Sequence, residues 1–170
     1  MSKRKPLVSI VMGSDSDHAV MAYAEEALNE FGVSYEIKII SAHRTPNEMS
    51  SFARSAARRG VRCIIAGAGG AAHLPGMVAA HSELPVIGVP VPHGALQGQD
   101  ALLSIVQMPK GVPVATVAIG NAYNAGLLAV QILGTGQASL MKQVRDYKER
   151  LRKKVLSKKL VSNSKGKGRR

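Results

Sequence analysis

The regular alternation of short apolar segments with segments of helical periodicity constrains the fold of this chain more than any other feature. The apolar segments lie at residues 7–12, 34–41, 61–66, 85–91 and 114–119. The first is apolar almost throughout, which is typical of a strand buried on both faces. Strands that alternate with helices predict an α/β protein with a parallel sheet and right-handed crossovers. We expect a three-layer, doubly wound sheet with the flavodoxin-like strand order 2-1-3-4-5.

Helix signals fill the intervals between these strands. The expected helices cover residues 20–31, 46–60, 77–81, 96–107 and 121–133. Pro46 suits the first position of a helix. Gly32 and Gly60 follow the last apolar positions of the first two helices, as helix-ending glycines do. The helix over 121–133 is apolar around most of its circumference, so we expect it to be buried on nearly all sides.

The C-terminal region combines one more helix pattern with a basic tail. Apolar positions from Leu140 to Leu151 indicate a helix that packs on the core or on a neighbouring subunit. Residues 142–170 contain 13 Lys and Arg against 2 Asp and Glu, so most of the net charge of +12 lies there. We expect a single domain over residues 1–156 and a basic, disordered tail over 157–170.

The composition favours a water-soluble domain with an aliphatic core. Apolar residues make up 45% of the chain, aromatic residues 4%, and Trp is absent. No apolar run approaches the roughly 18 residues of a membrane span, and the first apolar segment is too short for a signal peptide. Cys63 is the only cysteine and lies in an apolar segment, so we expect a buried, unreactive thiol and a reducing, cytoplasmic location.

The turn Gly13–Asp17 follows the first strand and begins a helix. Ser14 and Ser16 offer hydroxyl groups beside the free N–H groups of the helix N-terminus, an arrangement that suits phosphate. Asp17 repels phosphate, but a carboxylate pairs well with ribose hydroxyls. On its own, the turn is explained equally well as a helix cap with solvated serines.

The segment Ser41–Pro46 places His43 and Arg44 at the end of the second expected strand, the edge where open α/β sheets bind ligands. Imidazole suits proton transfer near neutral pH. A guanidinium offers a fork for phosphate or carboxylate. Taken alone, His43 fits a hydrogen-bonded structural histidine and Arg44 a surface charge; their position after a strand favours proton chemistry on an anionic small molecule.

The third candidate is the Gly-rich segment Gly67–Gly76, which follows the third strand. Glycines let backbone N–H groups approach a ligand closely, although a tightly packed turn is the plainer explanation. Gly67, Gly69 and Gly70 do not have the dinucleotide-binding spacing, and no Walker lysine follows. His73 adds a second imidazole that a turn alone does not need.

Several other classes of site are disfavoured. The five histidines and the single cysteine show no metal-ligand spacing, so we expect no metal. No serine lies in a G-x-S-x-G elbow, which argues against a serine hydrolase. His18 and His81 are expected near helix ends, and His93 in a mobile turn, which makes these three weaker candidates.

Four segments together resemble a known family, the class I 5-(carboxyamino)imidazole ribonucleotide mutases of purine (IMP) biosynthesis, also called the phosphoribosylaminoimidazole carboxylase catalytic subunit. The segments are Met12–Asp17, Ser41–Pro46, Ala66–Gly76 and Ser104–Pro109. The likeness runs in order from Leu7 to Leu133. Pro92-His93-Gly94 departs from the family's usual turn, which leaves open whether that segment touches substrate or a neighbouring subunit.

The resemblance implies an isomerase that moves a carboxylate from the exocyclic nitrogen to carbon 4 of an aminoimidazole ribonucleotide, with His43 as general acid and base. It needs no ATP, flavin or metal, and implies a homo-octamer coupled to the ATP-dependent synthetase that forms the substrate. The substrate-binding residues it implies are Ser14, Ser16, Asp17, Ser41, Arg44, Gly67, Gly69, Gly70, Ala71, His73 and Leu74.

Three alternatives remain at this stage. A class II carboxylase, which uses free carbon dioxide, tends to carry Lys at the position of Arg44 and lacks the run Gly69–His73. A phosphosugar sensor on the same fold would bind a ligand without needing His43. Nucleic-acid binding by the tail is disfavoured because no aromatic residue follows Tyr147 to stack on bases.

Overall fold

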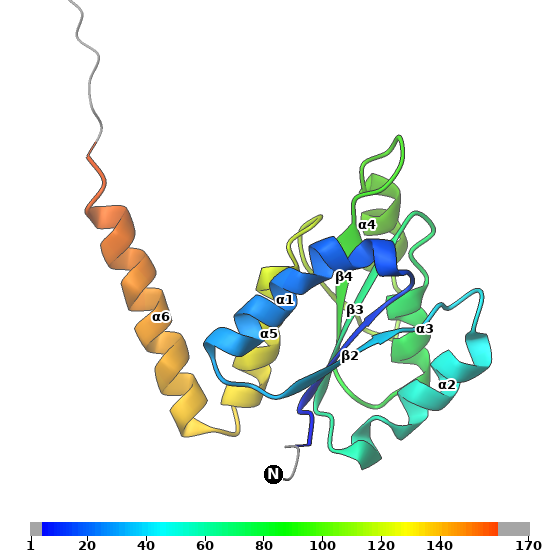
Figure 1. The fold of residues 1–170 in the computed structure, drawn as a ribbon, viewed down its shortest axis with the longest axis horizontal. Coiled ribbons are helices and arrows are strands. Elements are labelled where there is room, and N and C mark those ends of the chain that lie inside the picture. The colour runs from blue at the N-terminus through cyan, green and yellow to red at the C-terminus, as the bar shows by residue number, and fades with distance from the viewer. Residues whose placement is uncertain (1–4, 160–170) are drawn as a thin grey trace, which may run out of the picture.

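The structure is a computed structural model that describes residues 5–159. One parallel sheet forms its centre (Figure 1). Its strands are β1 (Val8–Met12), β2 (Tyr35–Ile39), β3 (Cys63–Gly69), β4 (Val86–Val91) and β5 (Ala115–Thr116). The strand order is β2-β1-β3-β4-β5 and every pair is parallel, which confirms the predicted flavodoxin-like topology.

Helices cover both faces of this sheet (Figure 1). They are α1 (His18–Glu30), α2 (Pro46–Ser55), α3 (Leu74–His81), α4 (Gln99–Val106), α5 (Ala122–Gly134) and α6 (Ala138–Leu156). Single 3-10 turns, η1 (Asp15–Asp17) and η2 (Ala57–Arg59), precede α1 and follow α2. Helices α1 and α5 pack side by side on one face, and α2, α3 and α4 cover the other.

The alternation of side chains along β1 explains why the sheet needs helices on both faces. Val8, Ile10 and Met12 belong to the apolar cluster under α1 and α5, whereas Val11 belongs to the cluster under α2, α3 and α4. All five residues of β1 are buried, as expected for a central parallel strand. Ser9, the one polar residue, donates a 2.6 Å hydrogen bond to Glu36 of β2.

The third strand is longer than expected, because β3 continues through Gly69 and takes in the start of the predicted Gly-rich loop. Gly67 pairs with Met12 and with Val89 in the sheet. A Cβ on Gly67 would lie 2.2 Å from the Sδ atom of Met21 on α1. A larger residue here would force the Met21 side chain to move, so glycine suits the helix-on-sheet packing, a reason that the sequence alone did not reveal.

Other boundaries also differ from expectation. The fifth strand shrinks to two residues, since only Ala115 and Thr116 pair with β4. Helix α4 begins at Gln99 and not at residue 96, because Gln97 and Gly98 have positive φ angles of 48° and 89° that a right-handed helix does not allow. Helix α3 begins earlier than expected, at Leu74, with Pro75 in its first turn.

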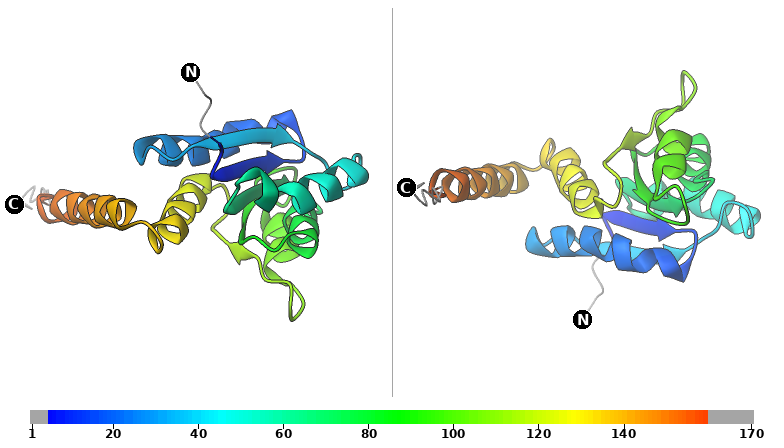
Figure 2. Two further views of the ribbon diagram at one scale, coloured as in Figure 1. Left: turned by 90° about the horizontal axis from the view of Figure 1, so that it is seen from below. Right: turned by 90° about the horizontal axis from the view of Figure 1, so that it is seen from above.

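Helix α6 extends away from the rest of the molecule (Figure 2). Leu140 and Val144 are buried against the core, and Tyr147 packs edge-on against Phe31, which follows α1, with ring centroids 5.6 Å apart. Leu151, predicted to share this buried face, is 45% exposed because it lies beyond the last core contact. Residues 160–170, most of the predicted tail, lie outside the described residues; the single domain over 1–156 stays a prediction.

Among residues 5–159, no helix combines the length and apolar character needed to cross a membrane.

Candidate active site

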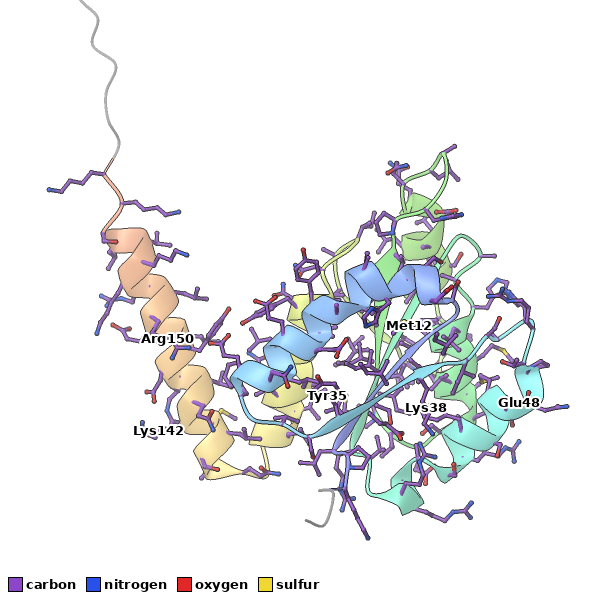
Figure 3. The ribbon with its side chains drawn as sticks, viewed as in Figure 1. Met12, Tyr35, Lys38, Glu48, Lys142 and Arg150 are labelled. Carbon is purple, nitrogen blue, oxygen red and sulfur yellow. The ribbon has the colours of Figure 1, made fainter. Side chains whose placement is uncertain are left out.

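The segments that follow β1, β2, β3 and β4 surround a cavity of about 330 Å³ at the carboxyl edge of the sheet. Figure 3 labels Met12, the last residue of β1, beneath α1 at this edge. The cavity is lined by Gly13, Ser14, Ser16, Asp17, Ser41, Ala42, His43, Arg44, Ala68, Gly69, Ala71, His73, Leu74 and His93. Parallel strands bring these distant segments together, because all their carboxyl ends meet at one edge.

Every residue that the sequence nominated for the site lines this cavity, except Gly67 and Gly70. Gly67 lies within β3 against Met21, as described above. Gly70 has a positive φ of 62°, so it serves the turn between β3 and α3 and does not form part of the cavity wall. The placement brings the nominated residues together, while their catalytic and binding roles stay predictions.

The first wall is the η1 turn. Its capping box is complete, since the Ser14 hydroxyl accepts from the N–H of Ser16 and the Asp17 carboxylate accepts from the N–H of Ser14 at 3.1 Å. Burial raises the pKa of the Asp17 carboxyl above its ordinary value, although the backbone N–H groups of Ser14 and Gly13 oppose this shift. Asp17 thus presents a half-buried carboxylate to the cavity.

The second wall is held in place by Arg44. Its Nη2 donates a 2.7 Å hydrogen bond to the carbonyl of Gly13, so the loop after β2 is tied to the loop after β1. The Ser41 hydroxyl accepts from the backbone N–H of Arg44 at 3.2 Å, which fixes the turn from which the guanidinium projects. Among the lining residues, Arg44 carries the one permanent positive charge and Asp17 the one carboxylate.

Two imidazoles that line the cavity are in contact with each other. The Nε2 of His43 and the Nδ1 of His73 are 2.7 Å apart, and the rings meet edge to face with their centroids 4.9 Å apart. One of these nitrogens must donate a proton and the other must accept it. His43 therefore has a hydrogen-bonded partner that orients its ring and can exchange a proton with it.

The structure also shows lining residues that the sequence analysis did not nominate, above all His93. It was expected in a mobile turn, yet it lies two residues after the end of β4 and lines the same cavity. The signal that singled out His43, a titratable side chain just after a strand, was present for His93 as well. Gly13, Ala42 and Ala68 contribute the remaining lining.

No metal-ligand cluster of three His, Cys, Asp or Glu side chains occurs within the described part of the chain. Cys63 is fully buried in β3, and burial raises the pKa of its thiol to about 12, so it stays protonated and unreactive. The side chains that line the cavity supply imidazole, carboxylate, guanidinium and hydroxyl groups.

The family model for AIR carboxylase matches residues 7–154, which spans the whole sheet and every cavity residue. The chain belongs to the AIR carboxylase family. A relative from Thermotoga maritima named N5-carboxyaminoimidazole ribonucleotide mutase is 61% identical over 90% of this chain and 90% of its own. Proteins of the same name from Mycobacterium tuberculosis (60%; 91% of this chain and 88% of that one) and from Synechocystis (61%; 93% and 90%) are equally similar.

Solved structures agree with the fold. The crystal structure of Treponema denticola PurE superposes with a TM-score of 0.80 at 32% identity and covers 89% of this chain and 94% of that one. A phosphoribosylaminoimidazole carboxylase from Candida albicans is 57% identical over 92% of this chain, but this chain spans only 28% of its length. The three mutases named above, in contrast, match this chain over nearly their whole length.

Proposed function

We propose that this AIR carboxylase family member is an N5-carboxyaminoimidazole ribonucleotide mutase of purine biosynthesis. The observation that carries the proposal is the convergence of His43, Arg44 and Asp17 on one cavity, in a chain about 60% identical to mutases of matching length. The product would be the aminoimidazole ribonucleotide carboxylated on ring carbon 4, an isomer of the substrate.

The first two walls of the cavity suit the phosphoribosyl part of this substrate. Ser14, Ser41 and Arg44 lie close together, and the hydroxyls and the guanidinium are groups that bind phosphate. Ser16 adds a hydroxyl on the same turn. The Asp17 carboxylate can accept hydrogen bonds from the ribose hydroxyls, whereas an ionised phosphate has no proton to donate to it.

The reaction breaks the bond between the exocyclic nitrogen and the carboxylate carbon and forms a bond from that carbon to ring carbon 4. In the proposed sequence, His43 gives a proton to the nitrogen as carbon dioxide leaves. Carbon 4 then attacks the carbon dioxide, and His43 takes the carbon 4 proton, which restores the aromatic ring. His43 gives up one proton in the first step and takes up one proton in the last, so no net proton is consumed.

The third wall holds the migrating group in this proposal. The backbone from Gly69 to Ala71 borders the cavity, and N–H groups of such a turn stabilise carboxylate charge. Leu74 adds an apolar surface beside it, which helps to confine the freed carbon dioxide near the ring. His73 keeps the His43 ring oriented through their 2.7 Å hydrogen bond.

Substrate choice separates this function from the carboxylase alternative. The test incubates the protein with the N5-carboxylated ribonucleotide and, separately, with the non-carboxylated amine plus bicarbonate, both without ATP. A mutase converts the first rapidly and the second slowly at ambient bicarbonate. Consumption of the amine alone would contradict the proposal, and binding without conversion of either ligand would indicate a sensor.

Assembly, location and a functional partner also belong to this proposal. We propose that the enzyme is a cytoplasmic homo-octamer, supplied by the ATP-dependent synthetase that makes its labile substrate. The exposed apolar side chains of Leu151, Val155 and Leu156 on α6 fit contact with a neighbouring subunit. A buried, reduced Cys63 fits the cytoplasm.

A further inference from the structure

His93 occupies a place in the cavity that the proposed mechanism does not use. Val91, the last residue of β4, pairs with Gly69 of β3, so the chain leaving β4 passes beside the end of β3. A Cβ on Gly69 would lie 3.2 Å from the Cβ of His93 and 3.1 Å from the carbonyl oxygen of Val91. The missing side chain at Gly69 therefore leaves the space in which His93 meets the cavity wall.

The fixed charges of the cavity do not balance the negative charges of an anionic substrate. The fixed charges of the lining residues are those of Asp17 and Arg44, which cancel. A substrate with a phosphate and a carboxylate brings at least two negative charges into this space. Imidazole is the side chain among the lining residues that gains a positive charge between about pH 5 and 8.

Among the three imidazoles, His93 is the one that is free to take this role. His43 and His73 are hydrogen-bonded to each other. Within residues 5–159 the ring of His93 has no hydrogen-bond partner, so both of its nitrogens are available to a ligand. The other groups around the cavity are the Asp17 carboxylate after β1 and the Arg44 guanidinium after β2. The positive charges of His93 and Arg44 both lower the pKa of Asp17, although burial raises it more.

Building on the proposed function, we propose that His93 binds the carboxylate of substrate and product at the Gly69 end of the cavity. The phosphate already has its partners on the loops after β1 and β2, where Ser14, Ser41 and Arg44 lie. His93 reaches the cavity from β4, on the side of the Gly-rich turn that is assigned to the carboxylate. His93 is thus a specificity residue for carboxylated ribonucleotides.

Removal of the His93 imidazole should affect carboxylated and non-carboxylated ligands differently. A hydrogen bond between the imidazole and a carboxylate contributes to binding only where the ligand carries that carboxylate. Affinity for the carboxylated product should therefore fall by about tenfold when the imidazole is removed. The non-carboxylated amine carries the same phosphate but lacks the carboxylate, so its affinity should show no such fall from His93.

The test is calorimetric titration of the carbon 4-carboxylated product and of the non-carboxylated amine at pH 6. His93→Gln should weaken product binding by about tenfold and leave amine binding within about twofold. His81→Gln is the matched control, because His81 lies outside the cavity with its Nδ1 against the Met77 carbonyl.

Gly69→Ala tests the contact between Gly69 and His93 directly. The new Cβ would press on the Cβ of His93 and on the Val91 carbonyl, so it should weaken product binding less in a His93→Gln background than in the wild type. Equal weakening of product and amine, or unchanged product binding at pH 6, would overturn the role of His93 and leave the proposed function standing. A wild type that binds neither ribonucleotide would overturn both.

Discussion

At the scale of single residues, neighbours decide what each titratable group can do. His43 taken alone resembled a structural histidine, but it faces His73 at 2.7 Å and shares a cavity with Arg44. Arg44 is not a free surface charge, since it is bonded to the Gly13 carbonyl. The sequence located both residues correctly because a strand end predicts an edge of the sheet. It could not show the His43–His73 contact, which depends on how two loops approach each other.

Substitution of His43 should mainly lower kcat, whereas substitution of Arg44 should mainly raise KM. His43→Asn removes the proton-transfer group and keeps a polar side chain, so we expect kcat to fall by about 10³-fold with KM nearly unchanged. Arg44→Ala removes a phosphate partner, so we expect KM to rise by about tenfold or more with a smaller change in kcat. Steady-state kinetics on both variants measures this split. Near wild-type turnover in His43→Asn would contradict its role as the base.

Removal of the Asp17 charge should stabilise the fold but weaken substrate binding. Because burial raises its folded-state pKa above the unfolded value, its contribution to stability is fully present only below the unfolded pKa and is lost as pH rises through the folded pKa. Asp17→Asn avoids the buried charge, so we expect its Tm to rise by about 1–2 °C at pH 7. The advantage should shrink toward pH 4, and substrate affinity should fall. Thermal scans across pH would disprove this if the variant were less stable at pH 7.

At the scale of elements, the strands and helices could be predicted from apolar periodicity, whereas positions set by tertiary packing could not. All five strands and the surrounding helices were found from apolar patterning, which reports burial directly. The Gly-rich segment was taken for a loop, because glycine usually marks a turn; Gly67 is a strand residue that makes room for Met21. His93 was ranked a weaker candidate because it was expected in a mobile turn, and whether its segment touches substrate was left open; the structure places it on the cavity wall.

The contact between α1 and α5 offers a direct test of such packing. A Cβ on Gly126 of α5 would lie 2.7 Å from the Cβ of Ala27 and 2.8 Å from the carbonyl of Ala24 on α1. Gly126→Ala should destabilise the protein by about 1–2 kcal/mol, since overpacking outweighs the gain in helix propensity. Gly134→Ala in the same helix is the control, because its nearest contact would be an ordinary 3.5 Å. Equal urea midpoints for the two variants would argue against this tight helix contact.

At the scale of the whole molecule, α6 is the element that the isolated chain explains least. Glu30 of α1 accepts hydrogen bonds from Arg150 of α6, at 2.7 Å, and from Tyr123 of α5, at 2.6 Å, which fixes where α6 leaves the body. Figure 3 labels Arg150 partway along the projecting helix. Beyond it, the apolar side chains of Val155 and Leu156 are 64% and 68% exposed. Nothing in the single chain covers them within the described residues.

The proposed octamer accounts for this exposed helix. Light scattering should give a mass near eight times the 18.0 kDa chain. Val155→Asp together with Leu156→Asp should shift the mass toward smaller species, because charges replace apolar contacts between subunits. A wild-type mass equal to one chain would refute the assembly, whereas the fold of each subunit would be unaffected.

Carbon-13 in the migrating carboxylate distinguishes a mutase from a carboxylase. The N5-carboxylated ribonucleotide, labelled in that carboxylate, is incubated with the protein in unlabelled bicarbonate and without ATP. Because the proposed mechanism keeps the freed carbon dioxide in the cavity, we predict carbon 4-carboxylated product that keeps most of the label. Product that carries unlabelled carboxylate from the solvent would contradict a mutase and indicate a carboxylase.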